Sequence, residues 1–380
     1  MSNNRAPGVA SVRPRVVLHY WGRRGGGSLF TLLLAQHLKA SQDPVDVFLS
    51  LADSNDDMVS FRATGLPILT LERPHLSTLW HAGWRLPKRL RMHANELAML
   101  RPDVVIITMN SPFAWPFIYA LQRLGIRVAY VAHDAEPHPG DYAALWQRVT
   151  QDLLLKSADQ IVVLSKSVAQ RVTERIPSTR SKISVLSLES VYPTKRTHLP
   201  FCATAGDPIR FLFYGRLLPY KGLDLLGQAL APLRTSPGWQ LTIAGSGPLE
   251  AEIRHTFSEW PQVELELGWI SNERTMTLYS THHLLLCPYT EASQSGVVAE
   301  ALSWAMPCLV MPSGALPEQI GFGTAGVVAE TVDAASFRRS VQIILEEPGR
   351  LAELSSASAK LLIERQSETG WIDLSSNQLI

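Results

Sequence analysis

Cysteine is scarce in this chain, and its few cysteines lie far apart. The 380 residues include only Cys202, Cys287 and Cys308, and no Cys-x-x-Cys pair is present. The sequence therefore excludes a disulfide framework and a zinc knuckle built on paired thiols. Cys287 and Cys308 fall in apolar runs, where a thiol acts as a small buried hydrophobe.

Long hydrophobic runs and an excess of one charge are also lacking. No stretch of about 18 or more consecutive apolar residues occurs, and the N-terminal residues lack the apolar core of a secretory signal. The 35 Lys and Arg are balanced by 34 Asp and Glu, which gives a net charge of +1. A protein that coats nucleic acid needs a large positive potential, so the sequence predicts no nucleic-acid partner. We expect a cytoplasmic protein in which any anion binds at a local site.

Apolar residues are abundant enough to build large cores. They make up 46% of the chain, charged residues make up 18%, and there are 10 Trp, 9 Tyr and 11 Phe. This composition excludes a disordered tail or linker. Since a domain has roughly 150 residues, we expect two domains with a cleft between them.

Short apolar, β-rich runs alternate with stretches of helical periodicity, which is the pattern of βαβ units in parallel sheets. A first series of runs covers residues 15–20, 45–50, 103–108, 127–133 and 160–165. A second series covers residues 209–215, 240–245, 263–268, 284–288, 308–312 and 326–330. The sequence therefore predicts an α/β protein with two doubly wound, Rossmann-like domains facing across a cleft.

A polar segment with three prolines, residues 189–208, separates the two series. We interpret it as the interdomain connection, because it has no helical period. The N-terminal domain is then expected over residues 1–188 and the C-terminal domain over residues 209–360. Residues 361–380 are expected to form a helical segment that packs back on the N-terminal domain.

In open parallel sheets, ligands bind beyond the carboxyl ends of the strands. After the first strand, a glycine run that includes Gly26 and Gly27 opens a helix, and such a turn brings backbone N–H groups close to an anion. It matches neither the P-loop nor the Gly-x-Gly-x-x-Gly pattern, so a plain tight turn is the alternative. His133 ends a later strand beside a proline-containing loop, where it is placed either to contact a ligand or to make a structural hydrogen bond.

The loop after His133 also carries a loose pair of carboxylates, Asp134 and Glu136. Nothing else in that loop requires a cation. We therefore expect neither a metal nor a cofactor.

Two cations flank the turn that follows the first strand of the second series. Arg216 presents a planar fork, and Lys221 presents a mobile point charge. Together they suit a diphosphate, although an Arg or Lys at a surface ordinarily forms an ion pair. Their position directly after a strand favours the functional interpretation.

A Gly-x-Gly turn that begins at Gly245 follows the next strand and is the best case for a nicotinamide-binding enzyme. The fingerprint is incomplete, because Glu250 stands where the third glycine is expected. A nicotinamide enzyme therefore has little support here.

A polar turn after residues 284–288 opens another helix, and its backbone N–H groups are expected to face phosphate. The residues of this turn and helix start are Ser293, Gln294, Ser295, Gly296 and Val297. Glu300 lies further along the helix, where a buried carboxylate needs hydrogen-bond partners such as ribose hydroxyls.

The order of these motifs resembles glycosyltransferase family 4 (GT4), the retaining, nucleotide-sugar-dependent enzymes with the GT-B fold. The segments YGRLLPYKGLDLL, AGSGPL and EASQSGVVAEALSWAMPCLVMPSGALPE carry the resemblance, which covers nearly the whole chain and is strongest over residues 211–320. It implies that Arg216 and Lys221 hold the donor diphosphate and that Glu300 binds the ribose. It also implies that His133 contacts the donor sugar.

Gly26 and Gly27 match the family's N-terminal glycine loop, near the donor phosphate and the acceptor. The chain departs from the family at one position, since family members carry two glutamates separated by seven residues. Counting back from Glu300 reaches Ala292, and Glu291 lies one residue away. Either a local shift lets Glu291 serve, or the backbone of residues 293–296 takes over its contacts.

The resemblance further implies a retaining transfer of a hexose from a UDP- or GDP-sugar. The expected acceptor is a glycan or a polyprenyl- or lipid-linked glycan, in the synthesis of cell-surface polysaccharide or glycolipid. Arg216, Lys221 and helix-terminal N–H groups would stabilise the leaving group without a metal. Because no carboxylate pair for a double displacement is evident, we expect a same-face attack assisted by the departing phosphate, with domain closure expelling water.

Residues 73–91 predict contact with an anionic membrane, on the inner face of the cytoplasmic membrane. Trp80 and Trp84 are interleaved there with basic residues, and no acid is present. The basic residues are Arg73, Arg85, Lys88, Arg89 and Arg91. A solvated basic face around one buried tryptophan is the alternative.

Two further functions stay open. A sugar-nucleotide epimerase on the same architecture would act on the donor without an acceptor. A non-catalytic nucleotide-sugar-binding subunit is favoured by the missing first glutamate, whereas the retained His133, Arg216, Lys221 and Glu300 oppose it.

Overall fold

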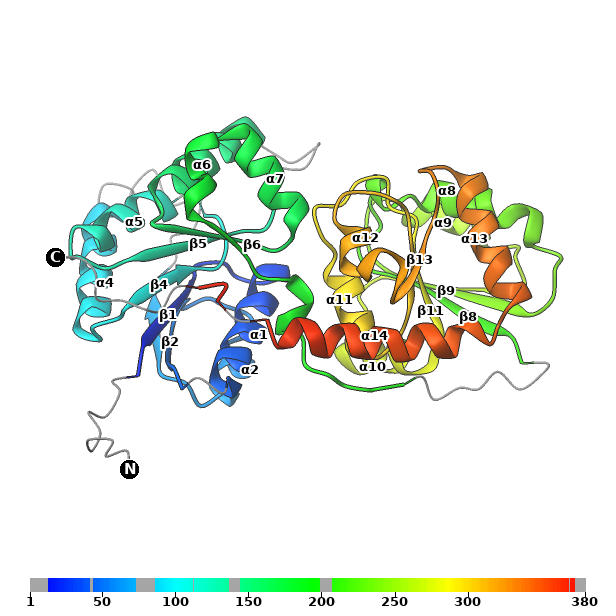
Figure 1. Cartoon of the computed structure of the whole chain (residues 1–380), viewed down its shortest axis with the longest axis horizontal. Coiled ribbons are helices and arrows are strands. Elements are labelled where there is room, and N and C mark those ends of the chain that lie inside the picture. The colour runs from blue at the N-terminus through cyan, green and yellow to red at the C-terminus, as the bar shows by residue number, and fades with distance from the viewer. Residues whose placement is uncertain are drawn as a thin grey trace, which may run out of the picture.

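The protein consists of two lobes, each built on one parallel sheet (Figure 1). A computed structural model of the chain describes residues 13–41, 44–72, 86–111, 113–136, 144–198, 207–368 and 370–372. The predicted α/β architecture with two parallel-stranded domains is confirmed.

The N-terminal sheet has seven strands in the order β3-β2-β1-β4-β5-β6-β7, and neighbouring strands are parallel. Val16 of β1 is in register with Val47 of β2 on one side and with Val104 of β4 on the other. The strands are β1 (Arg15–Tyr20), β2 (Asp46–Ala52), β3 (Ile68–Leu71), β4 (Val104–Ile107), β5 (Val128–Ala132), β6 (Gln160–Val163) and β7 (Ile183–Val185).

Helices cover both faces of this sheet, because its strands are apolar on both sides. Val17 of β1 packs in one core cluster, while Val16 and Leu18 pack in the other. The first cluster includes residues of α4 (Leu86–Met99), α5 (Ala114–Gln122), α6 (Ala144–Ser157) and α7 (Lys166–Arg175). The second includes residues of α1 (Gly26–Ala40) and α2 (Met58–Ala63).

The C-terminal sheet has six parallel strands in the order β10-β9-β8-β11-β12-β13 around a single core cluster. Its strands are β8 (Ile209–Tyr214), β9 (Trp239–Gly245), β10 (Val263–Leu267), β11 (Leu284–Cys287), β12 (Cys308–Val310) and β13 (Gly326–Val328). Its helices are α8 (Leu223–Leu230), α9 (Glu250–Phe257), α10 (Asn272–Thr281), α11 (Gly296–Ser303), α12 (Leu316–Gln319) and α13 (Ala334–Glu346).

All the strands expected from the sequence are present, and β3 and β7 are additional. Both are edge strands of the N-terminal sheet, with only 4 and 3 residues.

Two segments join the lobes within the part of the chain that the structure describes. One includes the 3₁₀ turn η4 (Leu188–Val191) in the predicted connection, of which residues 199–206 lie outside the described ranges. The other is α14 (Arg350–Gln366), which contains the expected boundary at residue 360 and runs from the C-terminal lobe toward the N-terminal lobe (Figure 1).

After α14, Trp371 and Ile372 lie in the N-terminal core. The carbonyl of Trp371 accepts hydrogen bonds from Gln160 Nε2 at 3.1 Å and from Ser184 Oγ at 2.6 Å. The chain therefore returns to the lobe in which it began.

The connection carries a buried carboxylate, Glu189, only 2% exposed. Burial raises the pKa of Glu189 to about 7, against the nearby charge of Arg365, whose Nε lies 3.5 Å from Glu189 Oε1. The contact between Glu189 and Arg365 thus joins the connection to the end of α14.

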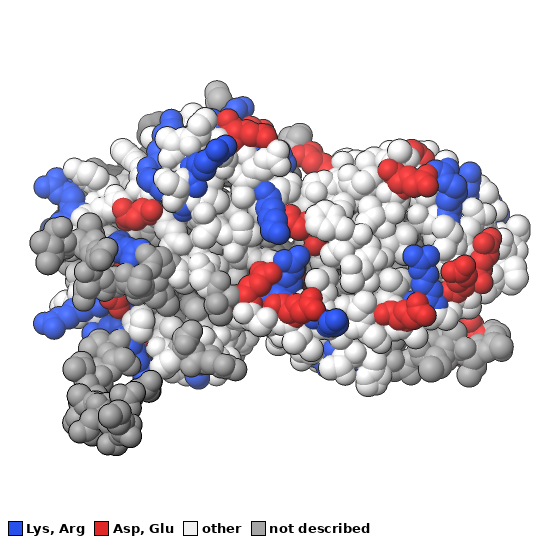
Figure 2. All heavy atoms as spheres, viewed as in Figure 1, with Lys and Arg blue, Asp and Glu red and all other residues white. Residues whose placement is uncertain are grey.

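Surface charge agrees with the near-neutral composition. Figure 2 shows basic and acidic side chains interspersed over this face, with both signs gathered where the lobes meet. Among the described helices, none combines the length and apolar character that crossing a bilayer requires.

Candidate functional site

The two sheets each change direction of winding at one point, where ligands of doubly wound folds bind. In the N-terminal sheet this point lies between β1 and β4, and in the C-terminal sheet it lies between β8 and β11. The candidates Gly26, Gly27, Arg216 and Lys221 and the turn 293–296 all follow one of these four strands.

His133 directly follows β5, beside that switch point. Its Nε2 lies 2.8 Å from the carbonyl oxygen of Thr108, so Nε2 carries the proton and donates. Burial lowers the pKa of His133, which keeps the ring neutral. Nδ1 is then an acceptor, and Gln294 Nε2 from the other lobe lies 3.4 Å from it. The edge of His133 packs against Phe30 of α1, with the ring centroids 4.9 Å apart.

Gln294 therefore contacts the opposite lobe and presents a second polar atom. Its Oε1 is buried and has no hydrogen-bond partner among the described residues. The same holds for Oδ1 of Asn110, three residues beyond β4, which the sequence analysis did not identify. Buried carbonyl oxygens without partners suit a ligand that carries hydroxyl or amino donors.

Two more contacts hold the lobes together at this end of the sheets. Ser165 Oγ donates to the carbonyl of Ser293 at 3.4 Å. The carboxylate of Glu318 accepts from the backbone N–H groups of Lys166 at 2.9 Å and Ser167 at 3.3 Å. These N–H groups open α7, so Glu318 meets the positive end of a helix in the other lobe.

Lys221 is a buried cation. It is 8% exposed, and its Nζ lies 3.6 Å from the centroid of the Tyr289 ring. Burial, together with the charge of Arg216, lowers the pKa of Lys221 to about 8. No carboxylate of a described residue lies within 4.0 Å of its Nζ. A cation that lies over the face of an aromatic ring and has no counter-ion can bind an anion.

Arg216 supplies a second cation close by. Its side chain is exposed, and Nη2 lies 3.4 Å from the hydroxyl of Tyr220. Because the charge of Arg216 lowers the pKa of Lys221, an anion bound by both side chains relieves an existing repulsion.

The three glycines Gly245, Gly27 and Gly26 differ in how closely other atoms approach them. Gly245 ends β9 with φ at +145°, and a Cβ there would lie 1.8 Å from the carbonyl oxygen of Gly215. It therefore allows two strand ends to approach each other. A Cβ at Gly27 would lie 2.8 Å from Cε2 of Tyr20 and 2.9 Å from Cε of Met109, whereas one at Gly26 would meet nothing within 4 Å.

The turn at 293–296 is held by a side chain that the sequence analysis missed, the buried Gln319. Its Oε1 accepts from Ser295 N at 2.7 Å, and its Nε2 donates to the Ser295 carbonyl at 3.2 Å. Ser295 in turn caps α11, since its Oγ accepts from Val298 N at 3.4 Å. The first-turn N–H groups of Gly296 and Val297 have no acceptor within the helix, so they are left for a ligand.

Glu300 on α11 is already paired. Its Oε1 accepts from Trp304 Nε1 at 3.0 Å and forms an ion pair with Lys195 of the connection. Ala292 is buried and its carbonyl accepts from Ala315 N at 3.1 Å, whereas Glu291 is half-buried. A Cβ at Gly314 would lie only 1.5 Å from the Ala292 oxygen, so this loop packs tightly at the position of the missing glutamate.

The acidic pair after β5 is accounted for by protein contacts. Glu136 Oε1 lies 3.6 Å from Arg148 and 4.0 Å from Arg175. In the described ranges, no group of three His, Cys, Asp or Glu side chains is arranged to hold a metal ion.

Two family models match the chain and together cover both lobes. Residues 24–187 match the model described as Glycosyltransferase Family 4, and residues 208–347 match the one described as Glycosyl transferases group 1. A 2-deoxystreptamine glucosyltransferase from Streptomyces kanamyceticus is 22% identical over 277 residues. That match covers 71% of this chain and 64% of the relative, so the chain spans less than two thirds of the relative's length.

Solved structures share the fold at low sequence identity. A glycosyltransferase from Rickettsia africae is 13% identical with a TM-score of 0.72, over 93% of this chain and 94% of that one. The Anabaena protein HepE, solved in complex with UDP, is 15% identical with a TM-score of 0.69, over 93% and 95% of the two chains.

Proposed function

Because the chain belongs to the family 4, group 1 glycosyltransferases of the GT-B fold, we propose that it moves a hexose from a nucleoside diphosphate sugar to an acceptor hydroxyl with retention. Buried Lys221, a cation without a counter-ion beside Arg216, is the observation that carries the proposal. A diphosphate is the anion that two adjacent cations and free helix-terminal N–H groups bind best. HepE is solved with UDP, which supports a UDP-sugar ahead of a GDP-sugar as the donor.

In the proposed reaction, the bond between the anomeric carbon and the diphosphate oxygen breaks. The acceptor oxygen forms the new bond on the same face, and its proton passes to the departing phosphate. Lys221, Arg216 and the N–H groups of Gly296 and Val297 stabilise the charge that develops on the leaving group, without a metal. Such preorganised groups need no reorientation during the reaction.

We propose that the polar groups at the contact between the lobes recognise the sugar of the donor. Neutral His133 and the buried oxygens of Gln294 and Asn110 accept hydrogen bonds, and a hexose presents hydroxyls that donate them. Gln294 then supplies polar contacts in place of the family's first glutamate, since position 292 is alanine. Glu300 binds the ribose either through Oε2 or through Oε1 after a ribose hydroxyl replaces Lys195 there.

We further propose a glycan or lipid-linked glycan as the acceptor, at an anionic membrane reached through residues 73–91. Residues 73–85 lie outside the described ranges, but Lys88 and Arg91 are exposed on α4. The curated relative is named for 2-deoxystreptamine, so a small aminocyclitol belongs among the acceptors tested.

Turnover of a UDP-sugar tests the proposal, with the anomeric configuration of the product read by proton NMR. We expect Lys221→Met and Arg216→Gln each to lower kcat by about 10²–10³, the usual cost of removing one such group. Arg254→Gln, which removes an exposed charge on α9, is the matched control and should leave kcat unchanged.

Near-normal turnover in Lys221→Met would contradict the proposed leaving-group site. An inverted product would contradict retention. Conversion of the donor without any acceptor would indicate an epimerase, and tight UDP binding with no product from any acceptor would indicate a binding subunit.

A further inference from the structure

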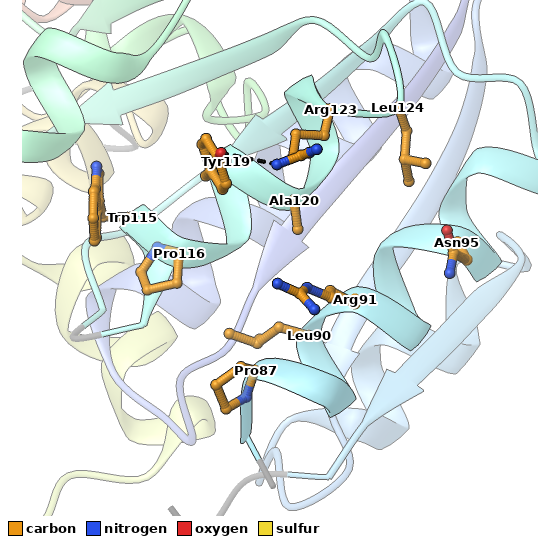
Figure 3. A pocket seen from close by; sticks show the side chains of 10 residues that line it. All are labelled: Pro87, Leu90, Arg91, Asn95, Trp115, Pro116, Tyr119, Ala120, Arg123 and Leu124. Atoms are coloured by element: carbon orange, nitrogen blue, oxygen red, sulfur yellow. Dashed lines mark hydrogen bonds between the residues drawn. The ribbon is translucent and has the colours of Figure 1, made fainter. Parts of the chain in front are cut away.

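A groove separate from the candidate site runs between α4 and α5 on the N-terminal lobe (Figure 3). Its volume is about 410 Å³, which is within the range of small-molecule sites. The walls are mainly apolar, with Leu90 and Pro87 from α4 and Trp115, Pro116 and Ala120 from α5.

Two arginines give this apolar groove a positive charge. Figure 3 shows the guanidinium of Arg91 between the two helices, facing Ala120, and Arg123 further along the same groove. Arg123 Nη1 donates to the hydroxyl of Tyr119 at 3.1 Å. No described carboxylate pairs with either arginine, and no acid lines the groove.

Amphipathic and apolar side chains stand exposed along the groove. Trp115 is 42% exposed, Tyr119 54% and Leu124 43%, and Met92 of α4 is 54% exposed nearby. Tryptophan and tyrosine beside arginine are the residues that lie at the level of lipid headgroups. A group of exposed apolar side chains marks a surface that contacts a membrane or a protein.

The groove is rigid, because buried groups fix α4 against α5. His93 of α4 stacks on Phe117 of α5, with ring centroids 5.8 Å apart. Both helices begin at the carboxyl end of the sheet, so Pro87 and Trp115 mark the end of the groove nearest the cleft.

We propose that this groove binds one hydrocarbon chain of an anionic membrane lipid, whose phosphate is met by Arg91 and Arg123. The inference rests on the proposed membrane-bound acceptor, and it adds α5 to the membrane-facing surface. An apolar wall with two unpaired cations complements an amphiphile that carries one apolar chain and one negative group. A free phosphate needs no apolar wall, and a cationic aminocyclitol is repelled by both arginines.

Binding to vesicles tests the groove apart from catalysis. Flotation is measured with the full chain and vesicles of phosphatidylcholine, either pure or with phosphatidylglycerol. Since each basic residue near an anionic surface is worth about 1 kcal/mol, we expect Arg91→Gln with Arg123→Gln to weaken binding about 30-fold. The charge-matched control, Arg62→Gln with Arg180→Gln, removes two exposed arginines elsewhere on the lobe and should bind nearly normally.

Ala120→Leu fills the groove without changing charge, and we expect it to weaken vesicle binding at least tenfold. Circular dichroism and UDP binding check that each variant is folded, and UDP binding should be unchanged in all of them. Loss of UDP binding by the parent protein would count against the proposed function, whereas vesicle results bear only on the groove.

Equal loss in the groove and control pairs would overturn the proposal in favour of diffuse electrostatics. Normal binding by Ala120→Leu would overturn the insertion of a chain into the groove. An absence of any dependence on phosphatidylglycerol would also overturn it and would leave the groove to a protein partner.

Discussion

Lys221 has an unusual environment for a lysine, with its charge on the face of Tyr289 and repelled by Arg216. Sequence position identified Lys221, Arg216 and His133 as candidates, because each follows a strand of a doubly wound sheet. It could not predict that Lys221 is buried without a counter-ion, since burial depends on how the 3₁₀ turn η5 (Pro219–Lys221) packs beside the residues that follow β11.

The lowered pKa of Lys221 predicts how donor binding depends on pH. The free lysine loses its charge as pH rises through about 8, and only the charged form attracts a diphosphate. We therefore expect Lys221 to contribute no change in the Kd for UDP below pH 7 and to make that Kd rise toward tenfold per pH unit above 8. Calorimetric titration from pH 6 to about 9.5 measures this profile.

Lys221→Arg is the informative variant for this profile, because a guanidinium stays charged across the whole range. Its Kd should not follow the rise above pH 8, even if its affinity is lower throughout. A parallel rise in both proteins would place the titrating group elsewhere and contradict the role of Lys221.

Helix α4 is anchored by a buried hydrogen-bond chain that crosses from the sheet. His19 Nδ1 lies 2.9 Å from Ser50 Oγ, and Ser50 Oγ lies 2.7 Å from His93 Nε2. His93 Nδ1 reaches Glu96 at 3.1 Å. Burial lowers the pKa of both histidines, that of His19 to about 3, so each is a neutral ring with one donor and one acceptor.

The serine, histidine and glutamate of this chain have the order of a hydrolase triad, but Ser50 is completely buried. A nucleophile without access to solvent cannot reach a substrate, so this hydrogen-bond chain has a structural role. Ser50→Ala leaves His19 Nδ1 and His93 Nε2, both buried, without their hydrogen-bond partner, and we expect it to lower the free energy of unfolding by about 1–3 kcal/mol. Urea denaturation measures this loss.

Ser356→Ala removes an exposed hydroxyl that bonds only within α14 and is the matched control. It should change stability by less than about 0.5 kcal/mol. If Ser50→Ala lowers the free energy of unfolding by no more than Ser356→Ala does, the hydrogen-bond chain does not hold α4 in place.

At the level of elements, the sequence predicted every strand whose apolar run is long enough to be recognised. The three-residue β7 follows the polar turn Pro177–Lys182, and nothing in its own sequence distinguishes it from a loop. Its strand character comes from pairing with β6, which supplies the missing hydrogen bonds. Gln319 was not predicted for a related reason. It acts by accepting a hydrogen bond from Ser295, which lies 24 residues away in the sequence.

At the scale of the whole molecule, the site depends on contacts between two independently folded sheets. Gln294 meets His133, and Glu318 meets the start of α7, across separations of 161 and 152 residues. No local pattern encodes such pairs, because they form only after both domains have folded and closed. The sequence therefore placed His133 and Gln294 after predicted strands, but it could not predict their contact, and it did not identify Asn110 or Gln319.

The central claim is that this cleft binds a nucleoside diphosphate through Lys221, and thermal unfolding with nucleotides tests it most directly. At about 100 times its Kd, UDP should stabilise the parent protein by about 2.7 kcal/mol, and uridine should have little effect. In Lys221→Met the UDP stabilisation should largely disappear, while the protein without ligand stays folded. Equal stabilisation of both proteins by UDP, or none by UDP, GDP or ADP in the parent, would contradict the account.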